Sequence, residues 1–204
     1  MEVDWGQLIV AQLEFYWDVH LWPRLDGLTD AEYLWEPAEG CWSLRQREDG
    51  SYTLDSQWPE PSPAPVTTLA WRMMHVGAYC LGNRASAFFG DGSVPEDADM
   101  FDSRYLPASL PATASEAIAF LDQAYRKWHD GIAALDEEGL RRPLGPKGGE
   151  FAEDSMAGLV LHISREVMHH GGEICLLRDL YRAGGDQAGG HQAGGHQAGG
   201  PVRA

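Results

Sequence analysis

The chain carries few basic residues for its length. Of its 204 residues, 15 are lysine or arginine and 31 are aspartate or glutamate, so the formal net charge is −16 with neutral histidines. A protein this acidic is repelled by phosphate backbones and by anionic lipid headgroups. We therefore expect neither nucleic acid nor a membrane surface among its partners. The acidic residues are scattered rather than grouped in blocks, which is typical of a well-solvated surface.

Cysteines and long apolar runs are also scarce. The three cysteines, Cys41, Cys80 and Cys175, show neither a paired metal-binding spacing nor the spacing of a secreted disulfide scaffold. No run of about 18 apolar residues is present to span a bilayer. The N-terminus, Met1-Glu-Val-Asp-Trp5, lacks the basic and apolar regions of a signal peptide. These observations predict a cytoplasmic protein with free thiols.

Four stretches of the chain show the three-or-four spacing of apolar residues that is typical of one helix face. They cover residues 5–22, 67–89, 113–135 and 155–182. Pro23 ends or bends the first helix, and Thr113-Ala-Ser-Glu116 has the form of a capping box at the start of the third. A short extra helical turn is expected over residues 28–34, capped by Thr29 or Asp30. Four long amphipathic helices predict an all-α four-helix bundle.

The segment between the first two helices is irregular. Two short strands, at residues 42–45 and 51–54, are predicted on either side of a turn at residues 48–50. Four prolines then fall within residues 59–65, which excludes a helix or a central strand. We therefore expect a long, irregular, proline-rich loop, and a loop of this length in a compact domain is usually functional or mobile.

Residues 1–182 are predicted to form one domain with a substantial core. The remaining residues, 183–204, are rich in glycine, histidine and glutamine and contain two copies of Gly-Gly-His-Gln-Ala. Such a composition predicts a disordered tail. His191 and His196 within it could bind metal loosely, but a flexible tail is the simpler interpretation.

The last helix carries a row of polar side chains beside its apolar stripe. His162, Glu166 and His170 follow one another at intervals of four, and four residues advance an α-helix by about 400°, so each lies nearly above the last. His170 fills the gap in the stripe between Val167 and Ile174, and it therefore occupies a position that faces the core. A carboxylate and an imidazole one turn apart can bind the same metal ion. The site would still need a ligand from a second helix.

His75, near the middle of the second helix, is the candidate for that ligand. It lies beside the apolar stripe of its own helix. Taken alone, a histidine in such a position is more often a core residue with one satisfied ring nitrogen. Glu166 can likewise be a surface carboxylate that pairs with Arg165 or His162. The adjacent His169 and His170 are harder to explain in this way, because one of the two must face inward and a buried, unpaired imidazole costs free energy.

Gly171 and Gly172 follow directly after this row. Each glycine inside a helix costs roughly 1 kcal/mol relative to alanine. Because the apolar stripe continues in phase to Tyr181, we expect the helix to continue and its backbone to approach another group closely at these glycines. For His162, four roles stay open: a group that orients a ligand, a fourth ligand, a general base, or a plain surface histidine.

These motifs resemble those of the DinB-like metal-binding four-helix bundles. The matching pieces are Trp71-Arg-Met-Met-His75, Glu166-Val-Met-His-His170-Gly-Gly-Glu-Ile-Cys-Leu-Leu-Arg178 and Leu25-Asp-Gly-Leu-Thr-Asp30. The resemblance covers roughly residues 5–182, and neither the proline-rich loop nor the tail has a counterpart in it. It implies that His75, Glu166 and His170 are the ligands of one divalent metal.

Many members of that family carry three histidine ligands, whereas this chain has Glu166 at the middle position. The His/Glu/His set is similar to that of the mycothiol-dependent maleylpyruvate isomerase branch. This resemblance implies zinc as the metal, and Ni²⁺ or Fe²⁺ are the alternatives. It also implies a low-molecular-weight thiol, mycothiol or bacillithiol, as a partner, and Glu173 as a group that orients a ligand.

The leading hypothesis is therefore a metal-dependent thiol transferase or isomerase, in which His162 or His169 handles protons. Three protein ligands leave a position open, as in catalytic sites. The alternatives are a hydrolase that uses metal-activated water, a non-catalytic metal-binding protein associated with stress, and a structural bundle whose histidines are packed core groups. The expected partners are a small-molecule substrate and the thiol, and the many aromatic residues are compatible with a homodimer through helix faces.

Overall fold

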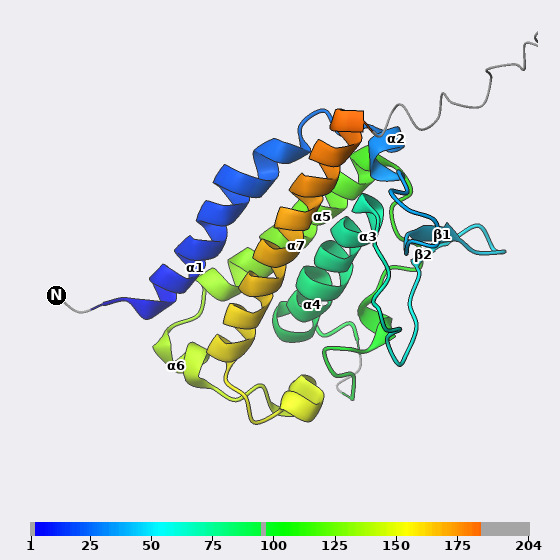
Figure 1. Ribbon diagram of the computed structural model, residues 1–204. Coiled ribbons are helices and arrows are strands. Elements are labelled where there is room, and N and C mark those ends of the chain that lie inside the picture. Colours follow the sequence, from blue (N-terminus) through cyan, green and yellow to red (C-terminus); the bar gives the residue numbers. More distant parts are fainter. Residues whose placement is uncertain (1–2, 95–96, 185–204) are drawn as a thin grey trace, which may run out of the picture.

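The computed structural model describes residues 3–94 and 97–184 and confirms the predicted all-α, four-helix architecture (Figure 1). The last helix continues to Gly184, two residues beyond the predicted end of the domain. Almost all of the predicted tail, including His191 and His196, lies outside the described residues. None of the described helices combines the length and the apolar content needed to cross a membrane.

Four long helical rods make up the bundle. They are α1 (Trp5–Phe15) with its π-helical continuation η1 (Tyr16–Leu21) and the 3₁₀ turn η2 (Trp22–Leu25); α3 (Leu69–Met74), the π-helix η3 (His75–Gly82) and α4 (Asn83–Phe89); α5 (Ala114–Ala133); and α7 (Met156–Gly184). The α1 rod packs against α5 and α7, and the α3–η3–α4 rod also packs against α5 and α7. The bundle core is thus enclosed by all four rods.

The rods begin where side chains satisfy their first backbone N–H groups. The Asp4 carboxylate accepts from the N–H of Gln7, and the Thr68 and Thr113 hydroxyls accept from the N–H groups of Trp71 and Glu116. The hydroxyl of Ser155 accepts from the N–H of Gly158 at 3.1 Å at the start of α7. These caps fix the residue at which each rod begins, and therefore which of its side chains face the core.

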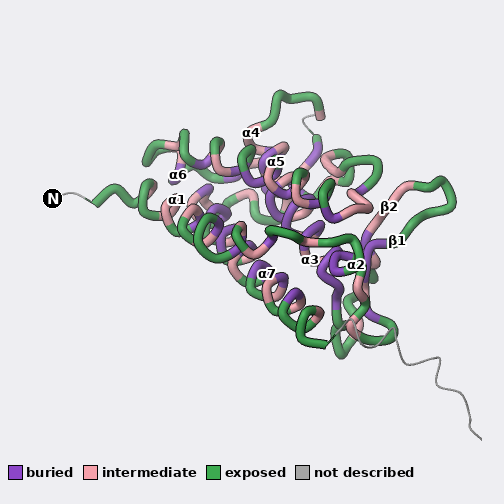
Figure 2. The backbone as a smooth tube through the Cα atoms, turned by 90° about the horizontal axis from the view of Figure 1, so that it is seen from above, coloured by how far each residue is buried: buried purple, intermediate pink, exposed green. Residues whose placement is uncertain are grey.

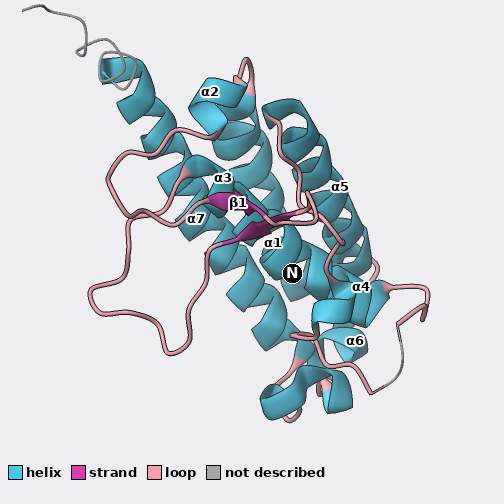
Figure 3. Cartoon of the chain, turned by 90° about the vertical axis from the view of Figure 1, so that its right-hand side faces the viewer, coloured by secondary structure: helices cyan, strands magenta, loops and turns pink. Residues whose placement is uncertain are grey.

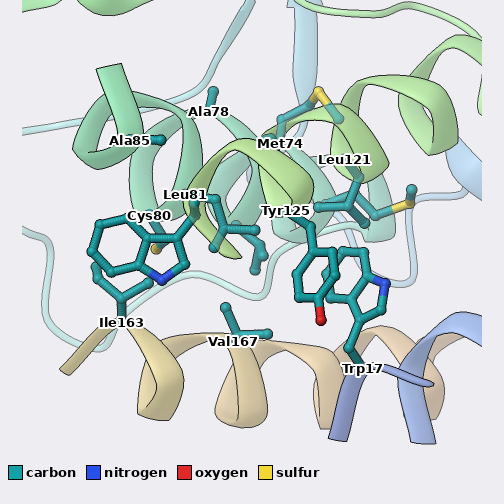
Figure 4. Packing of buried hydrophobic residues seen from close by; sticks show 14 of the residues in the cluster. Trp17, Met74, Ala78, Cys80, Leu81, Ala85, Leu121, Tyr125, Ile163 and Val167 are labelled. Carbon is teal, nitrogen blue, oxygen red and sulfur yellow. The ribbon is translucent and has the colours of Figure 1, made fainter. Parts of the chain in front are cut away.

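The core consists of the inward faces of the rods (Figures 2 and 4). The rings of Trp17 and Tyr125 stack with centroids 3.8 Å apart, which joins η1 to α5. Ile163 and Val167 point into the core from α7. Trp58 is 93% exposed, so it belongs to none of the aromatic core contacts.

The segment between α1 and α3 lies on one side of the bundle (Figure 3). It holds α2 (Asp30–Tyr33) and an antiparallel hairpin of β1 (Leu44–Gln46) and β2 (Tyr52–Leu54), at the predicted positions of the helical turn and of the two strands. Thr29 and Glu32 form a capping box at the start of α2. The proline-rich segment after β2 has no regular structure, as predicted.

A buried ion pair joins this segment to the bundle. The guanidinium of Arg178, which is fully buried on α7, donates to both carboxylate oxygens of Glu32 on α2, at 2.9 and 3.0 Å. It also donates to the carbonyl oxygens of Arg24 and Asp26. Most of the donors of this buried cation therefore have acceptors, which a buried charge requires.

Three short helices lie outside the four predicted long helices. They are η4 (Ser103–Tyr105), α6 (Glu137–Arg141) and η5 (Gly145–Phe151). The Asp136 carboxylate caps α6 by accepting from the N–H of Gly139. Segments this short carry too few apolar positions for a helical periodicity to be detected in the sequence.

Candidate metal centre

The structure brings His75, Glu166 and His170 together at the contact between η3 and α7. The Nε2 atom of His170 lies 3.3 Å from a carboxylate oxygen of Glu166, one helical turn earlier. The His75 ring stands edge-on to the His170 ring, with centroids 4.7 Å apart and an interplanar angle of 86°. Each of the three predicted ligands therefore neighbours another, although their role as ligands stays a prediction.

His75 is held as a neutral ring. It stacks on Trp71 with centroids 4.9 Å apart and planes 10° from parallel. Burial, with the nearby charges of His170, Arg72 and Arg84, lowers the pKa of His75 to about 3. At neutral pH this histidine therefore keeps a nitrogen lone pair free, as a metal ligand requires.

A carboxylate and a guanidinium fix the orientation of His170. Its Nδ1 atom lies 2.7 Å from the Glu173 carboxylate, and Arg72 Nε forms an ion pair with the same carboxylate oxygen at 3.0 Å. Arg72 Nη1 also approaches Nδ1, at 3.1 Å. We assign the proton to Nδ1, because a carboxylate accepts and its contact is the shorter one. The lone pair of His170 is then on Nε2, which faces Glu166.

The residues fit a divalent metal. With this tautomer, two acceptors face one another at 3.3 Å, the Nε2 lone pair of His170 and an oxygen of Glu166. Such a contact is repulsive unless a cation lies between the two atoms or a proton is added. Two imidazoles and one carboxylate suit zinc and also iron or nickel. Glu173 would complete the carboxylate–histidine arrangement that orients metal-ligating histidines.

Cys80 is a member of this cluster that the sequence did not indicate as a site residue. Its sulfur, a His75 ring nitrogen and a Glu166 oxygen all lie within 4.8 Å of one another. In an α-helix, five residues rotate the chain about 140° past one full turn, so Cys80 would point away from His75. The π-helix η3 pairs residues five apart instead. Burial raises the pKa of the Cys80 thiol to about 12, so without a metal it stays protonated.

His162 and His169, the predicted proton-transfer groups, flank the cluster. His162 Nδ1 accepts from Arg165 at 2.7 Å and lies 3.8 Å from a Glu166 oxygen. His169 is exposed, and its Nε2 atom lies 3.6 Å from a Glu173 oxygen. Both are near the candidate ligands, so a catalytic role for either stays a prediction.

Among the described residues, two sets of three donor atoms lie within 4.8 Å of one another. They are His75, Cys80 and Glu166, and His169, His170 and Glu173, so the three predicted ligands are divided between the two sets. We favour the cluster of His75, Glu166 and His170, because Arg72 already pairs with the Glu173 carboxylate and because His169 is exposed on the outer face of α7.

The predicted close approach at the two glycines holds for one of them. A Cβ atom on Gly171 would lie 2.5 Å from the Tyr16 hydroxyl oxygen of η1, closer than real contacts. Gly171 therefore lets η1 pack against α7 beside His170. At Gly172, which is exposed, a Cβ atom would meet nothing within 4 Å, so the predicted contact is wrong at this position.

Comparison with known proteins agrees with this architecture. The sequence model of the DinB superfamily matches residues 52–174, which include β2, the helices of the candidate centre and all three candidate ligands. Searches of the curated proteins and of the solved structures found no match. Because the superfamily match covers more than half of the chain, the protein belongs to the DinB superfamily.

Proposed function

We propose that this protein is a metal-dependent enzyme that uses one divalent ion, bound by His75, Glu166 and His170, to activate a small thiol. Zinc is the proposed metal, with nickel or iron as alternatives. The activity is a transfer or an isomerisation that begins with attack of the thiol on an electrophilic small molecule. The free thiols of Cys41, Cys80 and Cys175 support a reducing compartment such as the cytoplasm.

One observation carries the metal assignment. The Glu173 carboxylate lies 2.7 Å from Nδ1 of His170, and with the proton assigned to that nitrogen the Nε2 lone pair faces the Glu166 carboxylate 3.3 Å away. Packed core histidines do not need a carboxylate opposite their lone pair. A cation between these two atoms turns a repulsive contact into two favourable ones.

The residues around this ion would have three different roles: binding the ion, orienting a ligand and accepting a proton. His75, Glu166 and His170 bind it, and the Glu173 carboxylate, which pairs with Arg72, accepts from Nδ1 of His170 in the assigned tautomer. A divalent ion in this position lowers the pKa of a thiol or water that it binds, which supplies a nucleophile at neutral pH. His162 lies beside Glu166, and its proposed role as the proton acceptor requires its Nδ1 atom to give up the hydrogen bond from Arg165.

The choice of a thiol over water as nucleophile comes from the resemblance of the ligand set to the mycothiol-dependent isomerase branch. We propose mycothiol or bacillithiol as the thiol. Turnover of an electrophilic substrate that needs the added thiol supports this proposal. Turnover of ester or amide substrates without any thiol would instead identify a hydrolase.

The first experiment measures the metal content of tag-free protein. We expect about one zinc, nickel or iron per chain in the wild type and none in the double variant Glu166→Ala, His170→Ala. The control is His20→Ala, because His20 is an exposed histidine on the α1 rod outside the cluster. Wild-type protein that stays without metal after incubation with zinc would contradict the proposal.

Cys80 supports a second candidate function, a non-catalytic metal-binding protein. With its sulfur close to His75 and Glu166, Cys80 could become a fourth ligand and close the site, as in structural zinc sites. Replacement of the metal by cobalt distinguishes the two cases. A sulfur-to-cobalt charge-transfer band that is lost in Cys80→Ala would favour the closed site, and its absence from the wild type would favour the enzyme.

A further inference from the structure

Beside the candidate metal centre lies a pocket of about 350 Å³. We call it the Arg84–Arg165 pocket. It is formed where α4, the start of α7, the loop before η4 and the η5 segment meet. Its apolar walls are the side chains of Met100, Phe101, Leu144, Phe151 and Leu159. The polar side chains that line it are Arg84, Asp154, His162 and Arg165. The pocket thus combines an apolar body with a few charged groups, as small-molecule sites do.

The polar atoms that this pocket offers are mainly donors. Arg84 stands over the Phe101 ring, with its guanidinium carbon 4.6 Å from the ring centroid, and donates to the carbonyl oxygen of Tyr79. Its Nε atom is buried and has no hydrogen-bond partner among the described residues. Arg165 donates to His162 Nδ1, which leaves Nε2 of His162 as that ring's donor nitrogen. A ligand that reaches the remaining N–H groups of Arg84 and Arg165 or Nε2–H of His162 must accept hydrogen bonds.

The charge of the two arginines points the same way. The chain has a net charge of −16, and most of the described arginines pair with a carboxylate. Within residues 3–94 and 97–184, neither Arg84 nor Arg165 forms such an ion pair. Asp154, the acidic residue of the lining, is exposed. Arg84 is half-buried, whereas Arg165 is exposed at the rim. A half-buried guanidinium without a counterion gains free energy when an anion binds to it.

We propose that the Arg84–Arg165 pocket binds a small monocarboxylate with an apolar or aromatic body. The carboxylate would pair with the two guanidinium groups, whose planar forks match its geometry, and the body would contact the apolar walls. A dianion such as phosphate fits less well, because the Asp154 carboxylate repels its larger charge and because it has no apolar part to pack against the apolar walls.

The position of this pocket makes the carboxylate a substrate class for the metal centre. His162 lines the pocket and lies 3.8 Å from the Glu166 carboxylate, so the bound molecule and the ion would be neighbours. The role as substrate rests on the proposed metal-dependent function. Binding of the carboxylate itself does not, and the two can be tested separately.

The test is a calorimetric titration of the full chain with benzoate, in metal-free and in zinc-loaded protein. Benzamide, which has the same shape without the charge, and inorganic phosphate are the comparison ligands. We expect benzoate to bind in both preparations and more tightly than either comparison ligand. Arg165→Met should weaken benzoate binding about tenfold, since a hydrogen bond to a charged group is lost.

The control variant is Arg126→Met, because Arg126 is exposed on α5 and pairs there with Asp122. Since loss of Arg84 can unfold the protein, Arg84→Lys is tested beside Arg84→Met, and it should retain part of the affinity. Equal binding of benzoate and benzamide, or equal affinity in Arg165→Met and Arg126→Met, would overturn the pocket.

Two outcomes separate this proposal from the proposed function. Benzoate binding with the expected arginine dependence in a protein that takes up no zinc supports the pocket and removes the metal function. Benzoate binding only to zinc-loaded protein, unaffected by Arg84→Lys and Arg165→Met, places the carboxylate on the metal and overturns the pocket.

Discussion

At the scale of single residues, the candidate centre depends on a chain of polar contacts from Arg72 through Glu173 to His170. The guanidinium of Arg72 holds the Glu173 carboxylate at 3.0 Å, and that carboxylate holds the Nδ1 atom of His170 at 2.7 Å. Without Glu173, both the tautomer and the ring orientation of His170 would be free to change.

Glu173→Gln should lower the affinity for zinc by about 10- to 100-fold, because the amide holds the imidazole proton on Nδ1 less well than a carboxylate. The affinity is measured by competition with a chromophoric chelator. The matched control is Asp179→Asn, which removes an exposed carboxylate of α7 that pairs with Arg24. An unchanged affinity in Glu173→Gln would show that Glu173 does not position His170.

The two adjacent glycines of α7 should respond differently to alanine. Gly172→Ala should be neutral or raise the free energy of unfolding by up to about 1 kcal/mol, because its Cβ meets nothing and alanine favours a helix. Gly171→Ala should be less stable than Gly172→Ala by about 1–3 kcal/mol, because its Cβ would collide with the Tyr16 ring. Urea unfolding measures both, and equal stabilities would contradict the close packing of η1 on α7.

At the scale of elements, two features determine what the helices can do. The π-helix η3 places residues five apart on one side, and so adds Cys80 to the cluster of His75. The pair of Arg178 and Glu32 attaches α2 to α7 in the interior. Each feature depends on a local departure from the ordinary helix or on a contact between distant segments.

Breaking the buried pair should destabilise the protein strongly. Arg178→Met leaves the Glu32 carboxylate without its main partner in the interior, and we expect a loss of about 3–5 kcal/mol of unfolding free energy. The double variant Arg178→Met, Glu32→Leu should recover much of that loss, because it removes both charges. A double variant no more stable than the single one would show that the packing, rather than the ion pair, carries the effect.

The same pair predicts a dependence of stability on pH. Burial alone raises the pKa of Glu32, but the hydrogen bond and charge of Arg178 outweigh it, so the pKa lies below the ordinary value of a glutamate carboxyl. A carboxyl with a lowered pKa in the folded state contributes stability above its unfolded pKa, and this contribution disappears as the pH falls through the folded pKa. Urea unfolding between pH 7 and pH 3 should therefore show a steeper loss for the wild type than for Glu32→Gln.

At the scale of the whole molecule, the arrangement of the rods assembles the candidate site. His75 comes from the α3–η3–α4 rod, whereas Glu166 and His170 come from α7. The Arg84–Arg165 pocket is formed by the same two rods together with the segments around Phe101 and Phe151. A strongly acidic protein thus gathers two arginines beside a cluster of candidate metal ligands, which favours an anionic small molecule over a macromolecular polyanion.

The sequence by itself determined the four rods, because apolar periodicity, the helix caps and the prolines act over a few residues. It also predicted the inward position of His170, since that residue fills a gap in the apolar stripe, and this position is confirmed by burial. The role of His75, Glu166 and His170 as ligands stays a prediction that the geometry supports.

Only the tertiary structure decided the addition of Cys80, the contact of Arg72 with Glu173, the close approach of Tyr16 to Gly171 and the Arg84–Arg165 pocket. Cys80 lies near His75 because both are in a π-helical segment, in which residues five apart face the same side. A sequence analysis that assumes 3.6 residues per turn does not predict this. The other contacts join different rods, such as Arg72 with Glu173, Tyr16 with Gly171 and Arg84 with Arg165, which are 101, 155 and 81 positions apart in the chain. They exist because packing of the core brings side chains of separate rods into contact. A local sequence pattern gives no information about contacts between distant segments.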